Sequence, residues 1–160
     1  MSISAHEKGG SIMAASSTAI SYGVQAQSIS KGGVVLLGRF LFGLIFIMSG
    51  LNHFSKQTIG FAASQGVPLA SLAVPLSGVM SLLGGLSVLF GYRSRLGAWL
   101  IALFLVPVTF TMHKFWGVAD PGTAQIQMIM FMKNISMLGG ALLITQFGSG
   151  PLSLDGRHSH

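Results

Sequence analysis

Two cations, two histidines and one amide are the side chains in this sequence best suited to chemistry, because all lie in strongly apolar stretches. Arg39 and His53 belong to the first stretch and His113 to the third. Lys133 and Asn134 are neighbours in the last. No carboxylate lies inside any of these stretches, so the two cations have no counter-ion there. An oxyanion, a lipid phosphate or the carbonyl oxygen of a quinone would each be a suitable partner for them.

Other roles for these side chains remain open. A Lys or Arg at the centre of a membrane helix costs about 2.5–3.5 kcal/mol on insertion scales. Both side chains are long enough to reach the interface instead, and for Arg39 this is as good an interpretation as a functional one. His53 and His113 can also serve as interface anchors or as hydrogen-bonded core residues. Two histidines on different helices can ligate a haem b, but we expect both of these to lie too near the surface.

The elements that must position these residues are four apolar stretches, at residues 33–54, 72–91, 96–116 and 127–147. Each approaches the roughly 20 residues that a helix needs to cross about 30 Å of hydrocarbon. Strands of a membrane barrel would be about half as long and would alternate apolar with polar residues, which these do not. The sequence therefore predicts an all-α fold, a four-helix transmembrane bundle.

The composition agrees with a membrane protein. Of 160 residues, 51% are hydrophobic and only 8% are charged, whereas a soluble domain carries about 25% charged residues. Lipid is therefore the expected partner of most of the surface. The net charge of +6 has no basic run behind it, so we expect no nucleic-acid binding. The chain has no cysteine, which excludes disulfides, thiol redox chemistry and cysteine-ligated iron–sulfur clusters within it.

The chain divides into a tail rich in Ser, Ala and Gly at residues 1–32, a membrane domain at 33–157 and a short C-terminal tail at 158–160. We expect the first tail to be mobile. Outside the spans, five Lys or Arg residues fall on the side of both termini and two on the other side. This bias predicts that the N-terminus and the C-terminus are both cytoplasmic.

Small residues recur along the predicted helices at spacings that favour close packing. Helix two has Ser77, Ser81 and Gly85 at four-residue intervals, and helix one has Gly43 and Gly50. Small side chains let helix backbones approach closely in lipid, where no hydrophobic force drives helices together. We expect these positions to form a seam of the bundle. The loop at residues 55–71 is apolar enough to lie in the interface.

Several short motifs occur in a characteristic order: GRF (38–40), GYRSRL (91–96), HKFW (113–116), FMKN (131–134) and GSGPLSLD (148–155). In this order they resemble the DoxX/DoxD family of small four-helix bacterial membrane proteins. The resemblance covers residues 33–157 and implies a multi-pass protein of the bacterial inner membrane. The family is similar to the small subunit of an archaeal thiosulfate:quinone oxidoreductase, and many members carry an oxidoreductase label without an established activity.

The resemblance favours a role in quinone-linked redox chemistry, as an enzyme subunit or an accessory to one. His113 and Lys133 are then the candidate catalytic residues, while Arg39, His53 and Asn134 would hold the quinone or an anionic donor. Such donors stabilise negative charge on a quinone carbonyl, and His113 can supply a proton. We predict no metal site.

Two alternatives remain open. One is a non-enzymatic binding or transport protein for a small anion or lipid. The other is an accessory subunit whose partner chain, or a second copy of this chain, completes the machinery. Family members commonly carry a Glu in the middle of helix two, where this chain has Ser81. Any role of that Glu in pairing Arg39 or moving protons is therefore lost or replaced here.

Overall fold

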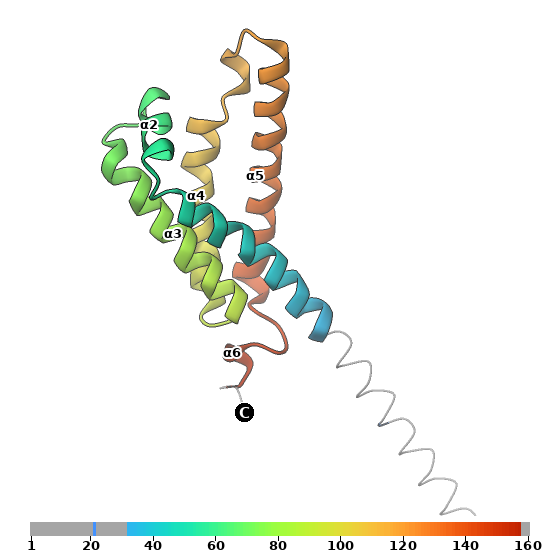
Figure 1. Cartoon of the computed structure of the whole chain (residues 1–160). Helices are drawn as coiled ribbons and strands as arrows, with labels where there is room; N and C mark the ends of the chain where they lie inside the picture. Colours follow the sequence, from blue (N-terminus) through green and yellow to red (C-terminus); the bar gives the residue numbers. More distant parts are fainter. Residues whose placement is uncertain (1–20, 22–31, 158–160) are drawn as a thin grey trace, which may run out of the picture.

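Four helices in the computed structural model are long and apolar enough to cross a membrane (Figure 1). The structure describes residue 21 and residues 32–157, and in that part it contains helices and no strands. The predicted all-α bundle is confirmed. The expectations for the tails at 1–32 and 158–160 fall almost wholly outside the described residues. The four long helices are the first span, Gly32–Asn52, then α3, Ala70–Phe90, α4, Ser94–Met112, and α5, Pro121–Phe147.

The fourth long helix begins earlier than the sequence pattern indicated, at Pro121 rather than at residue 127. The Asp120 side chain caps it by accepting a 2.7 Å hydrogen bond from the backbone N–H of Thr123. Proline suits the first position of a helix because its missing N–H would have no partner there. Lys133 therefore lies twelve residues into α5, about 18 Å along its axis at 1.5 Å per residue.

The loop between the first two spans contains a helix of its own, α2, at Lys56–Ser64. The Ser55 hydroxyl caps α2 by accepting a hydrogen bond from the Thr58 N–H at 3.1 Å. Ala62 is buried where α2 packs against α3. A 3₁₀ turn, η1, at Phe115–Gly117 joins α4 to α5. A four-residue helix, α6, at Leu154–Arg157 ends the described part of the chain.

The predicted seam of small residues joins the first span to α3. A Cβ added to Gly43 would lie 2.8 Å from the carbonyl oxygen of Gly85. A Cβ added to Gly50 would lie 2.8 Å from the carbonyl oxygen of Gly78. Between these two contacts the Ser81 hydroxyl donates a 2.8 Å hydrogen bond to the carbonyl oxygen of Phe46. Ser81 is fully buried there. The two helices therefore touch backbone to backbone.

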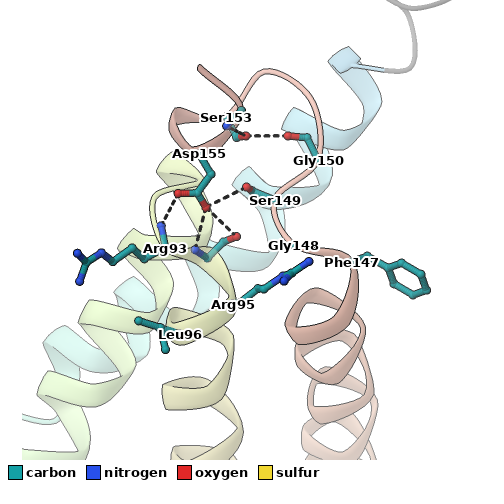
Figure 2. A pocket seen from close by; sticks show the side chains of 11 residues that line it. Arg93, Arg95, Leu96, Phe147, Gly148, Ser149, Gly150, Ser153 and Asp155 are labelled. Carbon is teal, nitrogen blue, oxygen red and sulfur yellow. Dashed lines mark hydrogen bonds between the residues drawn. The ribbon is translucent and has the colours of Figure 1, made fainter. Parts of the chain in front are cut away.

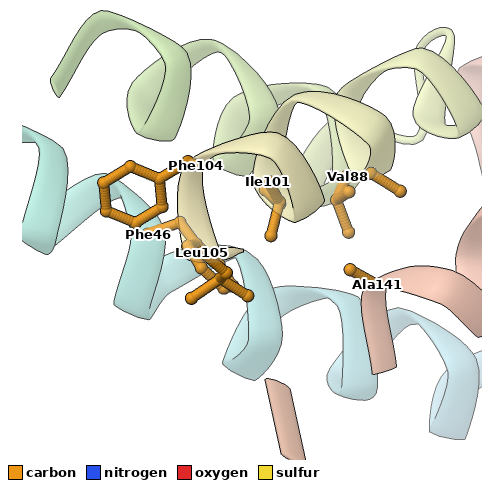
Figure 3. Packing of buried hydrophobic residues seen from close by; sticks show 7 residues of the cluster. Phe46, Val88, Ile101, Phe104, Leu105 and Ala141 are labelled. Atoms are coloured by element: carbon orange, nitrogen blue, oxygen red, sulfur yellow. The ribbon is translucent and has the colours of Figure 1, made fainter. Parts of the chain in front are cut away.

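The core of the bundle surrounds α4, which packs against both α3 and α5. Phe46 from the first span meets Phe104 edge to face, with ring centroids 6.5 Å apart. The fully or nearly buried members of this cluster lie together in Figure 3: Phe46, Val88, Ala98, Ile101, Phe104, Leu105 and Ala141. All four long helices contribute to this cluster.

Large apolar side chains cover the outside of the same helices. Leu72, Leu103 and Leu143 are each exposed over 60% or more of their surface. Soluble proteins rarely leave such large apolar areas uncovered. On helices of membrane-spanning length, lipid is the solvent that this surface fits.

The seam gives a direct stability test. We expect Gly43→Ala to lower the thermal unfolding temperature in detergent, because the added methyl must push α3 away, and overpacking costs about 1–3 kcal/mol. Gly38→Ala on the same helix is the matched control, since a Cβ there meets nothing within 4 Å. Ala favours a helix over Gly, so the control should be neutral or stabilising. Equal melting temperatures for the two variants would contradict the seam.

Candidate functional site

A cavity of about 230 Å³ lies at the end of the bundle that carries α2. It brings together four of the five residues proposed from the sequence: His53, His113, Lys133 and Asn134. The first span, α2, α4 and α5 all contribute to its walls. Its remaining lining is mostly apolar: Ile45, Phe46, Ser49, Thr58, Phe61, Phe104, Leu105, Val108, Met112 and Met137.

His53 directly follows the first span and is held in one orientation by residues of the bundle. Its Nδ1 lies 2.6 Å from the carbonyl oxygen of Ser49, and its ring packs edge to face on Phe104 at 5.4 Å between centroids. A carbonyl oxygen can only accept a hydrogen bond, so Nδ1 carries the proton. Nε2 is then the nitrogen that can accept a hydrogen bond from a ligand or bind a second proton.

His113 directly follows Met112, the last residue of α4. Its Nδ1 lies 2.9 Å from Oε1 of Gln127 on α5. With that oxygen as the acceptor, the proton again lies on Nδ1 and Nε2 remains for another partner. This hydrogen bond ties the end of α4 to α5 beside the cavity.

Asn134 is the most buried polar side chain of the cavity, with 5% of its surface exposed. Its side chain lines the cavity and makes no hydrogen bond to any other described residue. Its amide can donate a hydrogen bond to, and accept one from, a molecule inside the cavity. Lys133 precedes it at the exposed rim, with no carboxylate within 4 Å among the described residues.

The fifth proposed residue, Arg39, lies near the opposite end of the bundle and lines a different region. Its guanidinium donates to two backbone carbonyl oxygens after α5, Ser149 at 3.2 Å and Leu152 at 2.6 Å. Gly91 gives it room, since a Cβ there would collide with the guanidinium. Arg39 is buried, and of its nitrogens Nε makes no hydrogen bond within the described part of the chain. Sequence reasoning did not identify these carbonyls, because no side-chain pattern marks them.

The segment at residues 148–157, which we call the C-terminal clasp, closes that end (Figure 2). Asp155 accepts hydrogen bonds from the backbone N–H groups of Arg93 at 2.8 Å and Ser94 at 3.2 Å. It also accepts one from the Ser149 hydroxyl at 3.2 Å. Arg93 precedes α4 and its side chain, which has only donors, cannot cap the N–H groups of that helix, so a carboxylate 62 residues later caps α4 instead. The GRF, GYRSRL and GSGPLSLD motifs thus meet in one structural junction.

These contacts change the pKa of the Asp155 carboxyl. Partial burial raises its pKa, but the hydrogen bonds from Arg93, Ser94 and Ser149 outweigh this and hold the pKa below its usual value. A carboxyl with a depressed folded pKa adds stability above its unfolded pKa, about 3.9. That stability is lost as the pH falls through the lower folded pKa.

Comparison with known proteins places the chain among bacterial membrane proteins. The DoxX family model matches residues 34–114. Inner membrane protein YqjF of Escherichia coli is 32% identical over 123 residues, which are 76% of this chain and 88% of YqjF. Inner membrane protein YphA of the same organism is 30% identical over 78% of this chain and 89% of YphA. The ER-derived vesicles protein ERV29 of Saccharomyces cerevisiae is 24% identical over 76% of this chain and 40% of its own length. No solved structure matches the chain.

The clasp predicts a pH-dependent difference between two proteins. We expect Asp155→Asn to lower the melting temperature near pH 7, because a neutral amide caps α4 less well than a carboxylate. The gap to the wild type should shrink as the pH falls below the unfolded-state pKa of about 3.9 and through the lower pKa of the folded Asp155. Thermal melting of both proteins from pH 3 to 8 measures this gap. Asp120→Asn is the comparison, because Asp120 is a second carboxylate that caps a helix. A gap that stays constant with pH would exclude this role.

Proposed function

Because the chain belongs to the DoxX family and is a multi-pass inner-membrane protein, we propose that it binds a quinone head group in the cavity beside Asn134. In this proposal the protein is part of, or accessory to, a quinone-linked oxidoreductase system. The observation that carries the proposal is the buried amide of Asn134, which lines the cavity and has no described partner. A quinone carbonyl oxygen accepts a hydrogen bond from such an amide.

The other cavity residues suit the same ligand. Lys133 at the rim is a cation that favours negative charge developing on a quinone oxygen. His53 and His113 each direct Nδ1 to a partner, so each keeps Nε2 for the ligand. A quinone that is reduced takes up two electrons and two protons. In the proposed site a protonated imidazole at His113 supplies one of these protons from Nε2, and water supplies the other.

The electrons must come from outside this chain in the proposed system. The sequence has no cysteine to hold an iron–sulfur cluster and no flavin-binding motif. We therefore assign electron delivery to a partner subunit, and to this chain the binding and orientation of the quinone. Ser81 does not take the place of the family's Glu as a proton carrier, because its hydroxyl proton is engaged with the Phe46 carbonyl.

Binding of a short-chain benzoquinone to the purified protein tests this function. We expect Asn134→Leu to weaken binding about tenfold, because one hydrogen bond to a buried group is lost. Gln146→Leu, which makes the same amide-to-apolar change on an exposed turn of α5, should bind as the wild type does. Lys133→Met should also weaken binding, with Lys114→Met as its control. Binding can be followed by quenching of tryptophan fluorescence.

A wild-type protein that binds no quinone in this assay would overturn the proposal. The same titration with thiosulfate and with phosphate tests the alternative of a small-anion protein, which the unpaired ammonium of Lys133 favours. That alternative predicts anion binding that Lys133→Met abolishes and Asn134→Leu leaves intact. If Asn134→Leu and Lys133→Met both lose quinone binding, the result supports the quinone site over the small-anion alternative.

We also propose that both termini are cytoplasmic. Arg93 lies in the short turn between α3 and α4 and Arg95 in the first turn of α4, at the same end as the clasp. Positively charged short loops stay on the cytoplasmic side. A fluorescent-protein fusion after residue 160 should fluoresce, and an alkaline phosphatase fusion at the same point should be inactive. The reverse pattern would place the quinone cavity on the cytoplasmic side.

A further inference from the structure

A second cavity, of about 300 Å³, lies beneath α2, against α3 and α4. Its lining is mostly apolar, and its polar members are three hydroxyl residues and His53, which lies on the side of the first cavity. The residues that line this cavity and not the first are Ala62, Val67, Pro68, Ala73, Val74, Ser77, Pro107 and Thr111. No Lys, Arg, Asp or Glu is among its described residues.

The few hydroxyl groups of this cavity are already engaged. Ser77 Oγ donates to the Val74 carbonyl at 2.8 Å, and Thr111 Oγ1 donates to the Pro107 carbonyl at 2.7 Å. Thr58 Oγ1 pairs with the Ser55 hydroxyl at 2.8 Å. An ordered water needs two to four polar partners, and a small anion needs donors. The cavity fits neither as well as it fits hydrocarbon.

The two cavities share a wall. His53, Thr58, Val108 and Met112 line both. A molecule whose polar end meets Asn134 would therefore have an apolar space directly past His53. Ligand sites commonly combine a mostly apolar enclosure with a few placed polar groups, which is the arrangement of these two cavities together.

We propose that the cavity beneath α2 holds the hydrocarbon chain of the ligand whose head group binds beside Asn134. The ligand is then a chain-bearing amphiphile such as a prenylated quinone. This inference rests on the proposed function. Helix α2 covers the chain, with the buried Ala62 facing α3. Lipid is as apolar as the cavity, so the chain gains little free energy by leaving the bilayer, and the cavity chiefly fixes its position.

Photocrosslinking in bilayer nanodiscs tests where the chain lies. The probe is a benzoquinone with a ten-carbon chain that carries a diazirine at mid-chain. We expect its label on peptides within residues 62–77 and 107–112. Ala73→Phe, which fills the cavity from α3, should reduce that label at least tenfold. Leu76→Phe on the same helix is the matched control, because Leu76 is exposed and lines neither cavity.

A benzoquinone without a chain separates the two levels of the proposal. It should bind wild type and Ala73→Phe equally, since its head group does not reach Ala73. Label spread over lipid-facing residues such as Leu103 and Leu143, with the chainless quinone still bound, would overturn the chain site and keep the proposed function. Binding of neither quinone would overturn both. Ser77→Leu repeats the test if Ala73→Phe lowers the melting temperature.

Discussion

The close approach of the first span to α3 is the contact on which the rest of the structure depends. Glycines at 43, 50, 78 and 85 bring the two backbones together, and the Ser81 hydroxyl bonds to a carbonyl of the facing helix. In lipid, where apolar surface is already solvated, such packing and hydrogen bonding replace the hydrophobic force of a soluble core. The contact also sets the position of Phe46, which lies on the first span, and of His53, which directly follows its last residue.

The two ends of the bundle use polar groups in opposite ways. At the clasp end, Arg39 and Asp155 meet backbone groups that the ends of helices leave without partners. At the α2 end, Asn134 and Lys133 have no such partners among the described residues, while the two histidines are oriented by one hydrogen bond each. Polar groups that the fold does not need are the ones left for a ligand, and this asymmetry is why we locate function at the α2 end.

The motifs that indicate the family have different structural roles in this chain. GRF and GSGPLSLD helped to indicate the family. They meet at the clasp, where Arg39 of the first motif donates hydrogen bonds to backbone carbonyls of the second. HKFW and FMKN contribute His113, Lys133 and Asn134 to the cavity. Ser81, where family members commonly carry a Glu, acts here as a hydrogen-bond donor between helices. A position that differs from the family pattern is thus part of the seam in this chain, and the cavity is built without it.

The four spans, the glycine seam and four residues of the cavity could be predicted from the sequence, because apolar length, small-residue spacing and polar groups in lipid each have a local physical signature. Helix α2 and the early start of α5 depend on caps at Ser55 and Asp120. These caps are local features of the sequence, but the weaker hydropathy around them does not indicate a membrane helix. The contacts of Arg39 could not be predicted in this way. Its partners are backbone carbonyls more than 100 residues away, and a carbonyl group leaves no trace in the identity of the residue that carries it.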